Sequence, residues 1–158
     1  MFASLVEAMR QAVPERAAFV GVYSGGAWLA ERLAKMLPGN HPVGFVDVSF
    51  YRDDLARAGL KANVRATQLP FPVEGADIVL IDDVLFTGRS IRAAINTLFD
   101  YGRPRSVQLA VLADRGGREL PIAADYCGGQ VVMPADEMLE LSRDAAGGFR
   151  FHRVPRKF

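Results

Sequence analysis

Apolar residues in this chain of 158 residues fall into short unbroken runs that alternate with amphipathic segments. The run over 78–81 contains no polar position, which predicts a strand buried on both faces of a parallel sheet. Further along, Ile91, Ala94, Ile95 and Leu98 recur at helical spacing and predict an amphipathic helix that packs on that sheet. Alternation of these two patterns is typical of an α/β fold.

The same patterns predict the other elements of the chain. We expect a helix near the N-terminus, strands over 17–23, 43–51 and 107–112, a helix over 28–36, further sheet residues at 126 and 128–133, and an edge strand over 149–152. A polar stretch over about 53–72 predicts a mobile loop or a hairpin, and 142–158 is expected to be a frayed tail. No repeat divides the chain, so we predict one domain over 1–158.

Two adjacent carboxylates, Asp82 and Asp83, follow the apolar run over 78–81. Ligands of open parallel sheets bind at the carboxyl ends of the strands, so these acids are candidate ligand-binding residues. Successive side chains of a strand point to opposite faces, which predicts different roles for the two carboxylates. We expect one of them to contact the ligand and the other to orient it or to repel anions.

A short turn after the acids leads into the predicted helix and carries hydroxyl, glycine and guanidinium groups at Thr87, Gly88, Arg89 and Ser90. The unpaired amides and the positive dipole end of a helix N-terminus bind anions, and a glycine permits close approach of a phosphate. Each piece alone is common in solvated turns. In series, the strand, acid pair, turn and helix predict a site that holds a sugar phosphate from both ends.

The segment over 79–90 resembles the phosphoribosyl pyrophosphate (PRPP) motif of type I phosphoribosyltransferases. The chain is similar to the PyrR family from 82 to 126, including 102–104, 108–112, 114–116 and 118–126. The likeness extends upstream to 49–55. The resemblance implies an α/β, single-domain type I phosphoribosyltransferase fold, with a mostly parallel central sheet flanked by helices and a flexible hood loop over about 53–72. It also implies that PRPP is bound by Asp82, Asp83, Val84, Leu85, Phe86, Thr87, Gly88, Arg89 and Ser90.

The reaction that the resemblance implies joins uracil and PRPP to give uridine monophosphate (UMP) and pyrophosphate, with Mg²⁺ as cofactor. Asp82 and Asp83 would be the catalytic residues, which hold the ribose hydroxyls. They would also help to place the hydrated metal, without direct ligation by the protein, because Mg²⁺ usually keeps several waters.

A pyrophosphate site is implied at the first strand-to-helix turn, whose residues here are Ser24, Gly25 and Gly26. Many relatives carry an arginine at the position of Gly25, so a cation must come from another segment. The hood loop contains four cations, at Arg52, Arg57, Lys61 and Arg65. We expect Arg65 to be the replacement because it lies late in that loop.

A nucleobase site is implied in 114–118, after the strand over 107–112. Uracil presents alternating donors and acceptors, which backbone groups can read selectively. Arg115 is expected to line this site, and Leu139 to close over the ligand by family position. The alternative is an exposed turn in which Arg118 and Glu119 pair on the surface.

Two other functions stay open on the sequence. One is an RNA-binding attenuator that senses uridine nucleotides, has little catalytic activity and takes an mRNA leader as its partner. The acidic segment over 134–141 weakens the expected RNA face, although another basic surface is available from Arg10, Arg16, Arg150, Arg153, Arg156 and Lys157. The other is phosphoribosyl transfer to a purine base, against which the resemblance over 114–120 argues.

Composition narrows the setting in which the chain is expected to act. A formal net charge of +1 gives no general attraction to polyanions, and the single cysteine, Cys127, cannot form an internal disulfide. No apolar run approaches membrane-spanning length, so we expect no membrane partner. We therefore expect a cytoplasmic protein, and the resemblance implies a homo-oligomer, either a dimer or a larger assembly.

Overall fold

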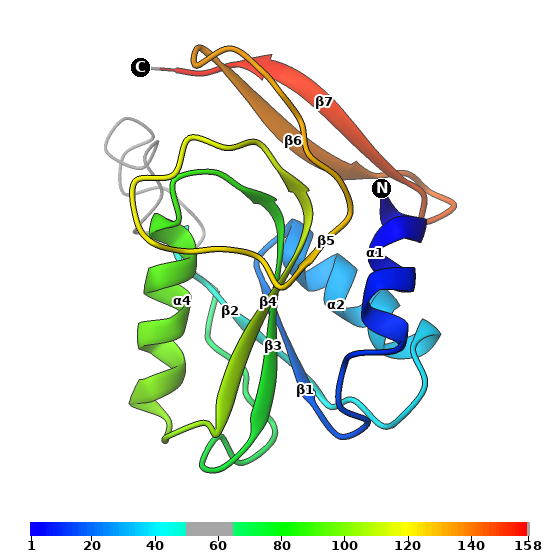
Figure 1. The fold of residues 1–158 in the computed structure, drawn as a ribbon, viewed down its shortest axis with the longest axis vertical. Helices are drawn as coiled ribbons and strands as arrows, with labels where there is room; N and C mark the ends of the chain where they lie inside the picture. Colours follow the sequence, from blue (N-terminus) through cyan, green and yellow to red (C-terminus); the bar gives the residue numbers. More distant parts are fainter. Residues whose placement is uncertain (50–64, 158) are drawn as a thin grey trace.

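The computed structural model of the chain describes residues 1–49 and 65–157. Within those ranges a parallel sheet of five strands forms the centre of the molecule, in the order β2-β1-β3-β4-β5 (Figure 1). The strands are β1 (Ala18–Val22), β2 (Val43–Val46), β3 (Asp77–Leu85), β4 (Ser106–Asp114) and β5 (Tyr126–Cys127). This architecture confirms the predicted α/β class with a parallel sheet.

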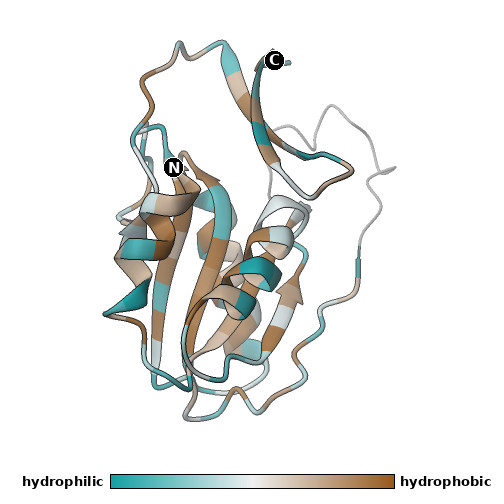
Figure 2. Cartoon of the chain, turned by 90° about the vertical axis from the view of Figure 1, so that its right-hand side faces the viewer, coloured by the Kyte–Doolittle hydropathy of each residue, from teal (hydrophilic) through white to brown (hydrophobic). Residues whose placement is uncertain are grey.

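Helices cover both faces of the sheet, as the uninterrupted apolar runs predicted. In β1, Phe19 packs into a core with α1 (Phe2–Arg10) and α2 (Gly25–Met36), while the next residue, Val20, packs into a core with α4 (Arg89–Asp100). The predicted inward face of α4 is confirmed, because Ile91, Ala94 and Leu98 are buried. Figure 2 shows the hydrophobic colouring concentrated along the central strands, between these two helical layers.

The C-terminal part of the chain forms a hairpin of β6 (Glu137–Arg143) and β7 (Phe149–Pro155), which lies above the carboxyl edge of the sheet in Figure 1. Leu141, Phe149 and Phe151 of this hairpin pack against the core that contains α1 and α2. Arg32 of α2 stacks 4.2 Å from the ring centroid of Phe149 and donates a hydrogen bond to the carbonyl of Gly147. The predicted frayed tail over 142–158 is therefore wrong for the described residues, since apolar packing and a strand ladder order them.

Several predicted boundaries also move. Helix α2 begins at Gly25, so the glycine turn before Trp28 is itself the first helical turn. Strand β3 continues through both acids to Leu85, because β4 pairs with it along that length. Of the predicted strand over 43–51, only 43–46 is a strand, and 50 and 51 lie outside the described residues. Of the predicted sheet residues at 126 and 128–133, β5 contains only 126 and 127, and Gln130 forms an isolated bridge with Asp114.

The strand order places a switch point between β1 and β3. From β1 the chain passes to β2 on one side, and then returns to add β3 and β4 on the other side. Connections that leave in opposite directions open a crevice at the carboxyl ends of the two strands, where ligands of such sheets bind.

No helix in the described ranges is long and apolar enough to cross a membrane.

Candidate functional site

Asp82 and Asp83 lie within β3, near its carboxyl end, at the switch point. By strand alternation Asp82 shares the face of Ile78 and Leu80, and Asp83 has the opposite face, as predicted. Asp82 is buried and Asp83 half-buried. Oδ1 of each acid accepts a hydrogen bond of 2.8 Å from the amide of the next residue. The two carboxylates therefore have fixed and different orientations, which suits two separate contacts with one ligand.

The first turn of α2 lies directly against β3, and this contact involves the predicted pyrophosphate turn. A Cβ atom on Gly25 would lie 2.5 Å from Oδ2 of Asp83, and one on Gly26 would overlap the carbonyl oxygen of Ile81. Any side chain at position 25 would therefore displace the Asp83 carboxylate.

A guanidinium group does reach this turn, from Arg65. Its Nη1 donates to Oγ of Ser24 over 2.9 Å, and its guanidinium carbon lies 4.7 Å from the ring centroid of Tyr23. The amide of Arg65 donates to Asp47, which follows β2 and so lies at the same edge of the sheet. The other three cations predicted in the hood loop, Arg52, Arg57 and Lys61, lie outside the described residues.

Asp47 is the anchor that holds Arg65 near the turn. Burial raises the pKa of the Asp47 carboxyl, but hydrogen bonds from the amides of Arg65 and Ser49, with the charge of Arg65, lower it below the ordinary value overall. Asp47 therefore stays ionised and keeps its bonds. Sequence reasoning missed this residue because the strand predicted over 43–51 enclosed it, whereas β2 ends at Val46 and leaves Asp47 directly after the strand.

The predicted phosphate turn caps helix α4. Gly88 is the N-cap residue, with φ +92°, and the helix begins at Arg89. Oγ1 of Thr87 accepts from the amide of Arg89 over 3.2 Å, and Nε of Arg89 lies 2.6 Å from Oε2 of Glu119 in an exposed ion pair. Ser90 lies in the first turn. These residues surround the amides and the positive end of the α4 dipole, which favour a phosphate.

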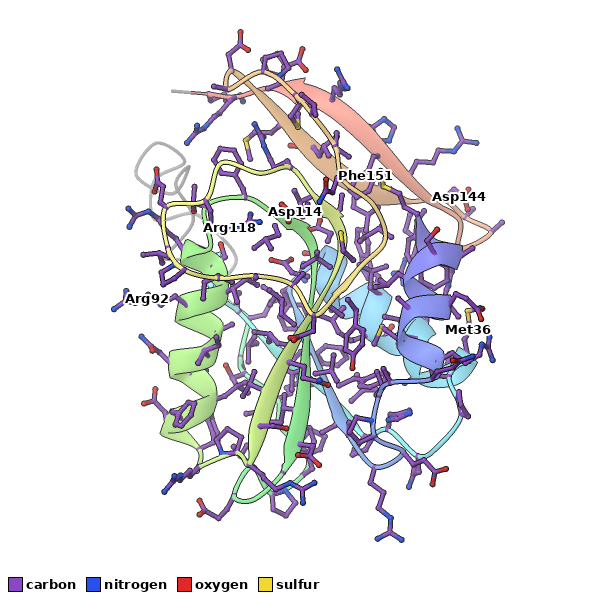
Figure 3. The ribbon with its side chains drawn as sticks, viewed as in Figure 1. Met36, Arg92, Asp114, Arg118, Asp144 and Phe151 are labelled. Atoms are coloured by element: carbon purple, nitrogen blue, oxygen red, sulfur yellow. The ribbon has the colours of Figure 1, made fainter. Side chains whose placement is uncertain are left out.

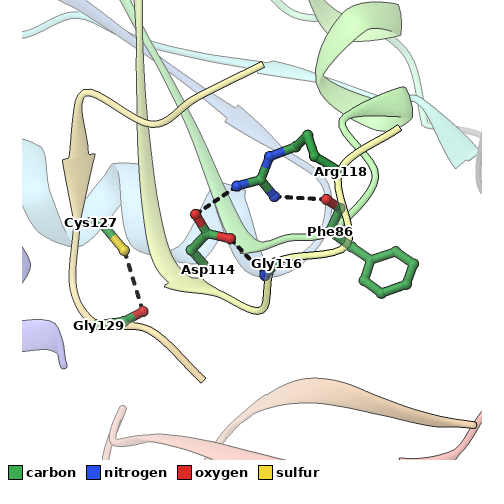
Figure 4. Close-up of polar contacts among 6 residues, drawn as sticks. All are labelled: Phe86, Asp114, Gly116, Arg118, Cys127 and Gly129. Carbon is green, nitrogen blue, oxygen red and sulfur yellow. Dashed lines mark hydrogen bonds and ion pairs between the residues drawn. The ribbon is translucent and has the colours of Figure 1, made fainter. Parts of the chain in front are cut away.

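The segment after β4, residues 114–122, which we call the base loop, is hydrogen-bonded to the phosphate turn. The amides of Glu119 and Leu120 donate to the carbonyl of Thr87 over 3.0 and 3.2 Å. The amide of Arg115 donates to the carbonyl of Leu85 over 3.0 Å. Nη1 of Arg118 donates to the carbonyl of Phe86 over 2.7 Å (Figure 4). The loop and the turn are therefore held together as one unit.

Asp114 and Arg118 form the ion pair at the centre of this unit, with Nη2 to Oδ2 at 2.7 Å (Figures 3 and 4). Burial raises the pKa of the Asp114 carboxyl, but hydrogen bonds from Arg118 and the amide of Gly116, with the charge of Arg118, lower it overall. The alternative in which Arg118 pairs with Glu119 is wrong: Glu119 pairs with Arg89, and Arg118 pairs with Asp114.

The two residues predicted to contact the base lie in different surroundings. Arg115 is half-buried, and its guanidinium donates to the carbonyls of Pro134 and Glu137. Leu139 lies in β6, half-buried, opposite Arg153 of β7. It shares the inward hairpin face of Leu141, which packs on the core. That Leu139 closes over a ligand stays a prediction.

The donor set at the switch point fits Mg²⁺ held mainly through substrate and water. Among residues 1–49 and 65–157 there is no group of three or more His, Cys, Asp or Glu side chains that could hold a metal. The carboxylates of Asp82 and Asp83 are the acidic groups beside the candidate phosphate positions. One or two carboxylates together with substrate phosphates are the usual way in which proteins bind Mg²⁺.

Comparisons with known proteins agree with this arrangement. Residues 4–137 match the family model described as phosphoribosyl transferase domain. Over 139 residues the chain is 55% identical to Bifunctional protein PyrR of Ralstonia nicotianae. The aligned region covers 86% of this chain and 79% of that protein. The chain is 43% identical over 148 residues to Bifunctional protein PyrR of Nitrosococcus oceani, covering 90% and 84%.

A solved structure shows the same fold. A hypoxanthine-guanine phosphoribosyltransferase from Bacillus anthracis aligns over 83% of this chain and 81% of its own, with a TM-score of 0.64 and 17% sequence identity.

Proposed function

Because this chain belongs to the phosphoribosyl transferase domain family, and within it to the PyrR proteins, we propose that it transfers the phosphoribosyl group of PRPP to uracil. The products are UMP and pyrophosphate. One observation carries the proposal: the acid pair of β3 runs into a helix-capping turn at the switch point, opposite the first turn of α2. That geometry provides separate positions for a sugar diol, a 5′-phosphate and a diphosphate.

The two acids are proposed to hold the ribose. Asp82 and Asp83 accept hydrogen bonds from its hydroxyls and orient the anomeric carbon. Positive charge develops on the sugar as the diphosphate leaves, and nearby carboxylates stabilise it. Mg²⁺ would be placed near these carboxylates through substrate and water, where it would supply positive charge to offset that of the diphosphate. The bond from N1 of uracil forms as the bond to the diphosphate breaks, and the N1 proton leaves to the departing diphosphate or to water; no dedicated base is evident in the sequence, so orientation is proposed as the protein's main contribution.

The two phosphate ends are proposed to occupy two helix N-termini. Amides and hydroxyls of the turn 87–90 bind the 5′-phosphate at α4, and Ser24 to Gly26 bind the diphosphate at α2. Arg65 supplies the cation that Gly25 lacks, from its position beside Ser24. The base is proposed to be read by backbone groups of the base loop, since backbone donors and acceptors can match the alternating edge of uracil.

Turnover of PRPP with a panel of free bases tests the proposal directly. We expect UMP formation with uracil and little product with hypoxanthine or guanine, measured by chromatography. Replacing Asp82 and Asp83 together by Asn should weaken PRPP binding at least about tenfold, since charge-assisted hydrogen bonds contribute roughly 1.5 to 3 kcal/mol each. Unchanged PRPP affinity in a folded double variant would count against the assignment, and turnover of a purine base in place of uracil would change the substrate.

A second function, RNA binding, is favoured by the exposed arginines of the hairpin. Arg150 and Arg153 are exposed on β7, and Lys157 is exposed beyond it, whereas Arg156 stacks on Phe86. We propose that these exposed cations, which strand alternation places on both faces of the hairpin, bind a pyrimidine-operon mRNA leader, since the curated relatives carry the name Bifunctional protein PyrR. Homo-oligomers of the chain, dimers or larger, are proposed as well.

Leader binding is tested by its dependence on salt and on charge. Affinity for the leader should fall steeply as salt rises, because counterions are released from the phosphates. Arg150→Glu with Arg153→Glu should abolish the difference between the leader and a random RNA of equal length, while uracil turnover persists. If the wild-type chain already binds both RNAs equally, specific regulation by this route is removed.

A further inference from the structure

Phe86 lies in the segment that joins the acid pair to the phosphate turn, and three parts of the chain meet at its ring. The guanidinium carbon of Arg115 lies 3.9 Å from the ring centroid, and that of Arg156 lies 5.4 Å from it. Arg115 belongs to the base loop, whereas Arg156 follows β7 at the end of the hairpin. The ring therefore connects the turn with the base loop and with the C-terminal hairpin.

Arg115 also binds the start of the hairpin directly. Its Nη1 donates to the carbonyl of Glu137 over 2.7 Å, and its Nη2 donates to that of Pro134 over 3.1 Å. These two bonds and the flat contact with Phe86 use the planar shape of the guanidinium, which an ammonium group does not share. Arg115 thus holds the ring of Phe86 and the beginning of β6 at the same time.

The position of Arg115 is unfavourable for a cation unless these contacts compensate. Its Nε atom is buried and has no hydrogen-bond partner among residues 1–49 and 65–157. Burial, and then the charge of Arg156, lower the pKa of the Arg115 guanidinium, while Glu137 acts in the opposite direction. A desolvated cation gains more from an aromatic ring than an exposed one. One N–H of Nη1 and one of Nη2 are used in the bonds to Glu137 and Pro134, and both of those bonds tie the guanidinium to the start of the hairpin.

We propose that Arg115 is a positioning residue, which fixes Phe86 to the C-terminal hairpin and so holds the turn 87–90 in the conformation that binds the 5′-phosphate. The proposal rests on the proposed function, because it assigns Arg115 to one part of the same site. Thr87 and Gly88 directly follow Phe86, so a displaced ring moves the groups that face the phosphate. A displacement of about 1 Å can lower activity on the order of a hundredfold.

Arg115→Gln and Arg115→Lys test the assignment in the full chain. We expect the dissociation constant and the KM for PRPP to rise about tenfold in Arg115→Gln, while the KM for uracil changes by less than about twofold. Arg115→Lys should resemble the Gln variant, because a lysine cannot stack and bind both carbonyls together. A raised KM for uracil with unchanged PRPP affinity would overturn the proposal and make Arg115 a base ligand.

Variants of the ring separate positioning from general destabilisation. Phe86→Leu should weaken PRPP binding as Arg115→Gln does, whereas Phe86→Tyr, which keeps the ring, should weaken it less. Arg92→Gln is the matched control, because it removes an exposed guanidinium that points away from the molecule on α4 (Figure 3). Equal PRPP affinity in Phe86→Leu and Phe86→Tyr would overturn the role of the ring.

Amide hydrogen exchange without any ligand gives a readout that does not depend on catalysis. Exchange at 87–90 should be faster in Arg115→Gln than in the wild type or in Arg92→Gln, and unchanged exchange would overturn the proposal. The two failures are distinguishable. A wild-type chain that does not bind PRPP overturns the proposed function and this inference with it, whereas a binding wild type with an unaltered Arg115→Gln overturns only the inference.

Discussion

At the turn after β1, close backbone packing and a positive charge come from two different residues. Gly25 lets the first turn of α2 lie against Asp83, since a Cβ atom there would be 2.5 Å from the carboxylate. Arg65 reaches the same turn from another segment, with Nη1 at 2.9 Å from Oγ of Ser24. The turn therefore has a cation beside it without a long side chain of its own. A diphosphate bound there would contact backbone amides and one exposed guanidinium.

Replacing Arg65 tests whether that cation serves the diphosphate. We expect Arg65→Gln to weaken PRPP binding about three- to tenfold, because a charge-assisted contact is lost at an exposed position. Arg65→Lys keeps the charge and should lose less PRPP affinity than Arg65→Gln. Titration calorimetry at two salt concentrations measures both effects, and the wild type should be the more salt-sensitive protein. Equal affinity of wild type and Arg65→Gln would leave Arg65 as a structural partner of Ser24.

The Asp114–Arg118 ion pair predicts an acid-sensitive contribution to stability. The pKa of Asp114 lies below its ordinary value of 3.8 in the folded chain, so the unfolded chain takes up the proton first as pH falls. The stabilisation is present above about pH 3.8 and is lost as pH falls through the lowered pKa. Asp114→Asn should therefore be less stable than wild type at pH 7, with the difference shrinking below pH 4 in urea unfolding. A constant difference across this range would contradict the linkage.

At the scale of elements, periodic apolar patterns predicted the buried faces of helices and strands better than polar residues predicted where those elements end. The inward face of α4 and the buried runs of β1, β3 and β4 followed from side chains that the sequence displays. The continuation of β3 through Asp82 and Asp83 could not be predicted from the sequence, because it depends on hydrogen bonds from β4. The edge strand predicted over 149–152 lies within β7, but its partner β6 was missed, because its inward residue Leu141 stands in a segment that was read only for its acidic residues.

The capping turn of α4 is an element whose geometry can be tested by a matched pair of glycines. Gly88 has φ +92°, and a Cβ atom there would lie 3.0 Å from Cγ1 of Ile122 in the base loop. Gly75 has φ +71°, but a Cβ atom there would meet no atom of the described part of the chain within 4 Å. Gly75→Ala should cost about 1 to 2 kcal/mol of unfolding free energy from backbone strain alone. Gly88→Ala adds steric conflict with Ile122 to that strain, and should cost more.

The Gly88→Ala and Gly75→Ala variants should also differ in their affinity for PRPP. Gly88→Ala is expected to weaken PRPP binding, because the turn must move away from the base loop, whereas Gly75→Ala should leave PRPP affinity unchanged. Denaturant titrations measure the stabilities, and calorimetry measures the affinities. Equal stability losses in the two variants would mean that Ile122 adapts without cost and that the turn is less tightly held than its contacts indicate.

At the scale of the whole molecule, the candidate site combines segments that are distant in the sequence. The order β2-β1-β3-β4-β5 brings the turn after β1, the acids of β3 and the base loop after β4 to one edge. This much was predictable, because parallel strands present their carboxyl ends together. The contact of Arg115 and Arg156 with Phe86 was not predictable, since it joins three segments with no shared periodic pattern.

The hairpin also makes the prediction of a single domain over 1–158 testable, through the only tryptophan of the sequence. Trp28 lies on α2, and the guanidinium carbon of Arg143, the last residue of β6, lies 4.9 Å from its ring centroid. Tryptophan fluorescence therefore reports on the docking of the hairpin on α2, whereas far-UV circular dichroism reports on the whole chain. If the hairpin and the sheet form one cooperative unit, the two signals should give the same midpoint in urea.

Arg143→Gln is the control for that measurement. It should change the fluorescence of the native state but shift the midpoint only slightly, because an exposed cation–π contact contributes about 0.5 to 1 kcal/mol. An early fluorescence transition, with circular dichroism following at higher urea, would mean that the hairpin detaches before the sheet unfolds. In that case the chain would contain two independently stable units, and the phosphate turn would lose its support from the hairpin before the domain itself is lost.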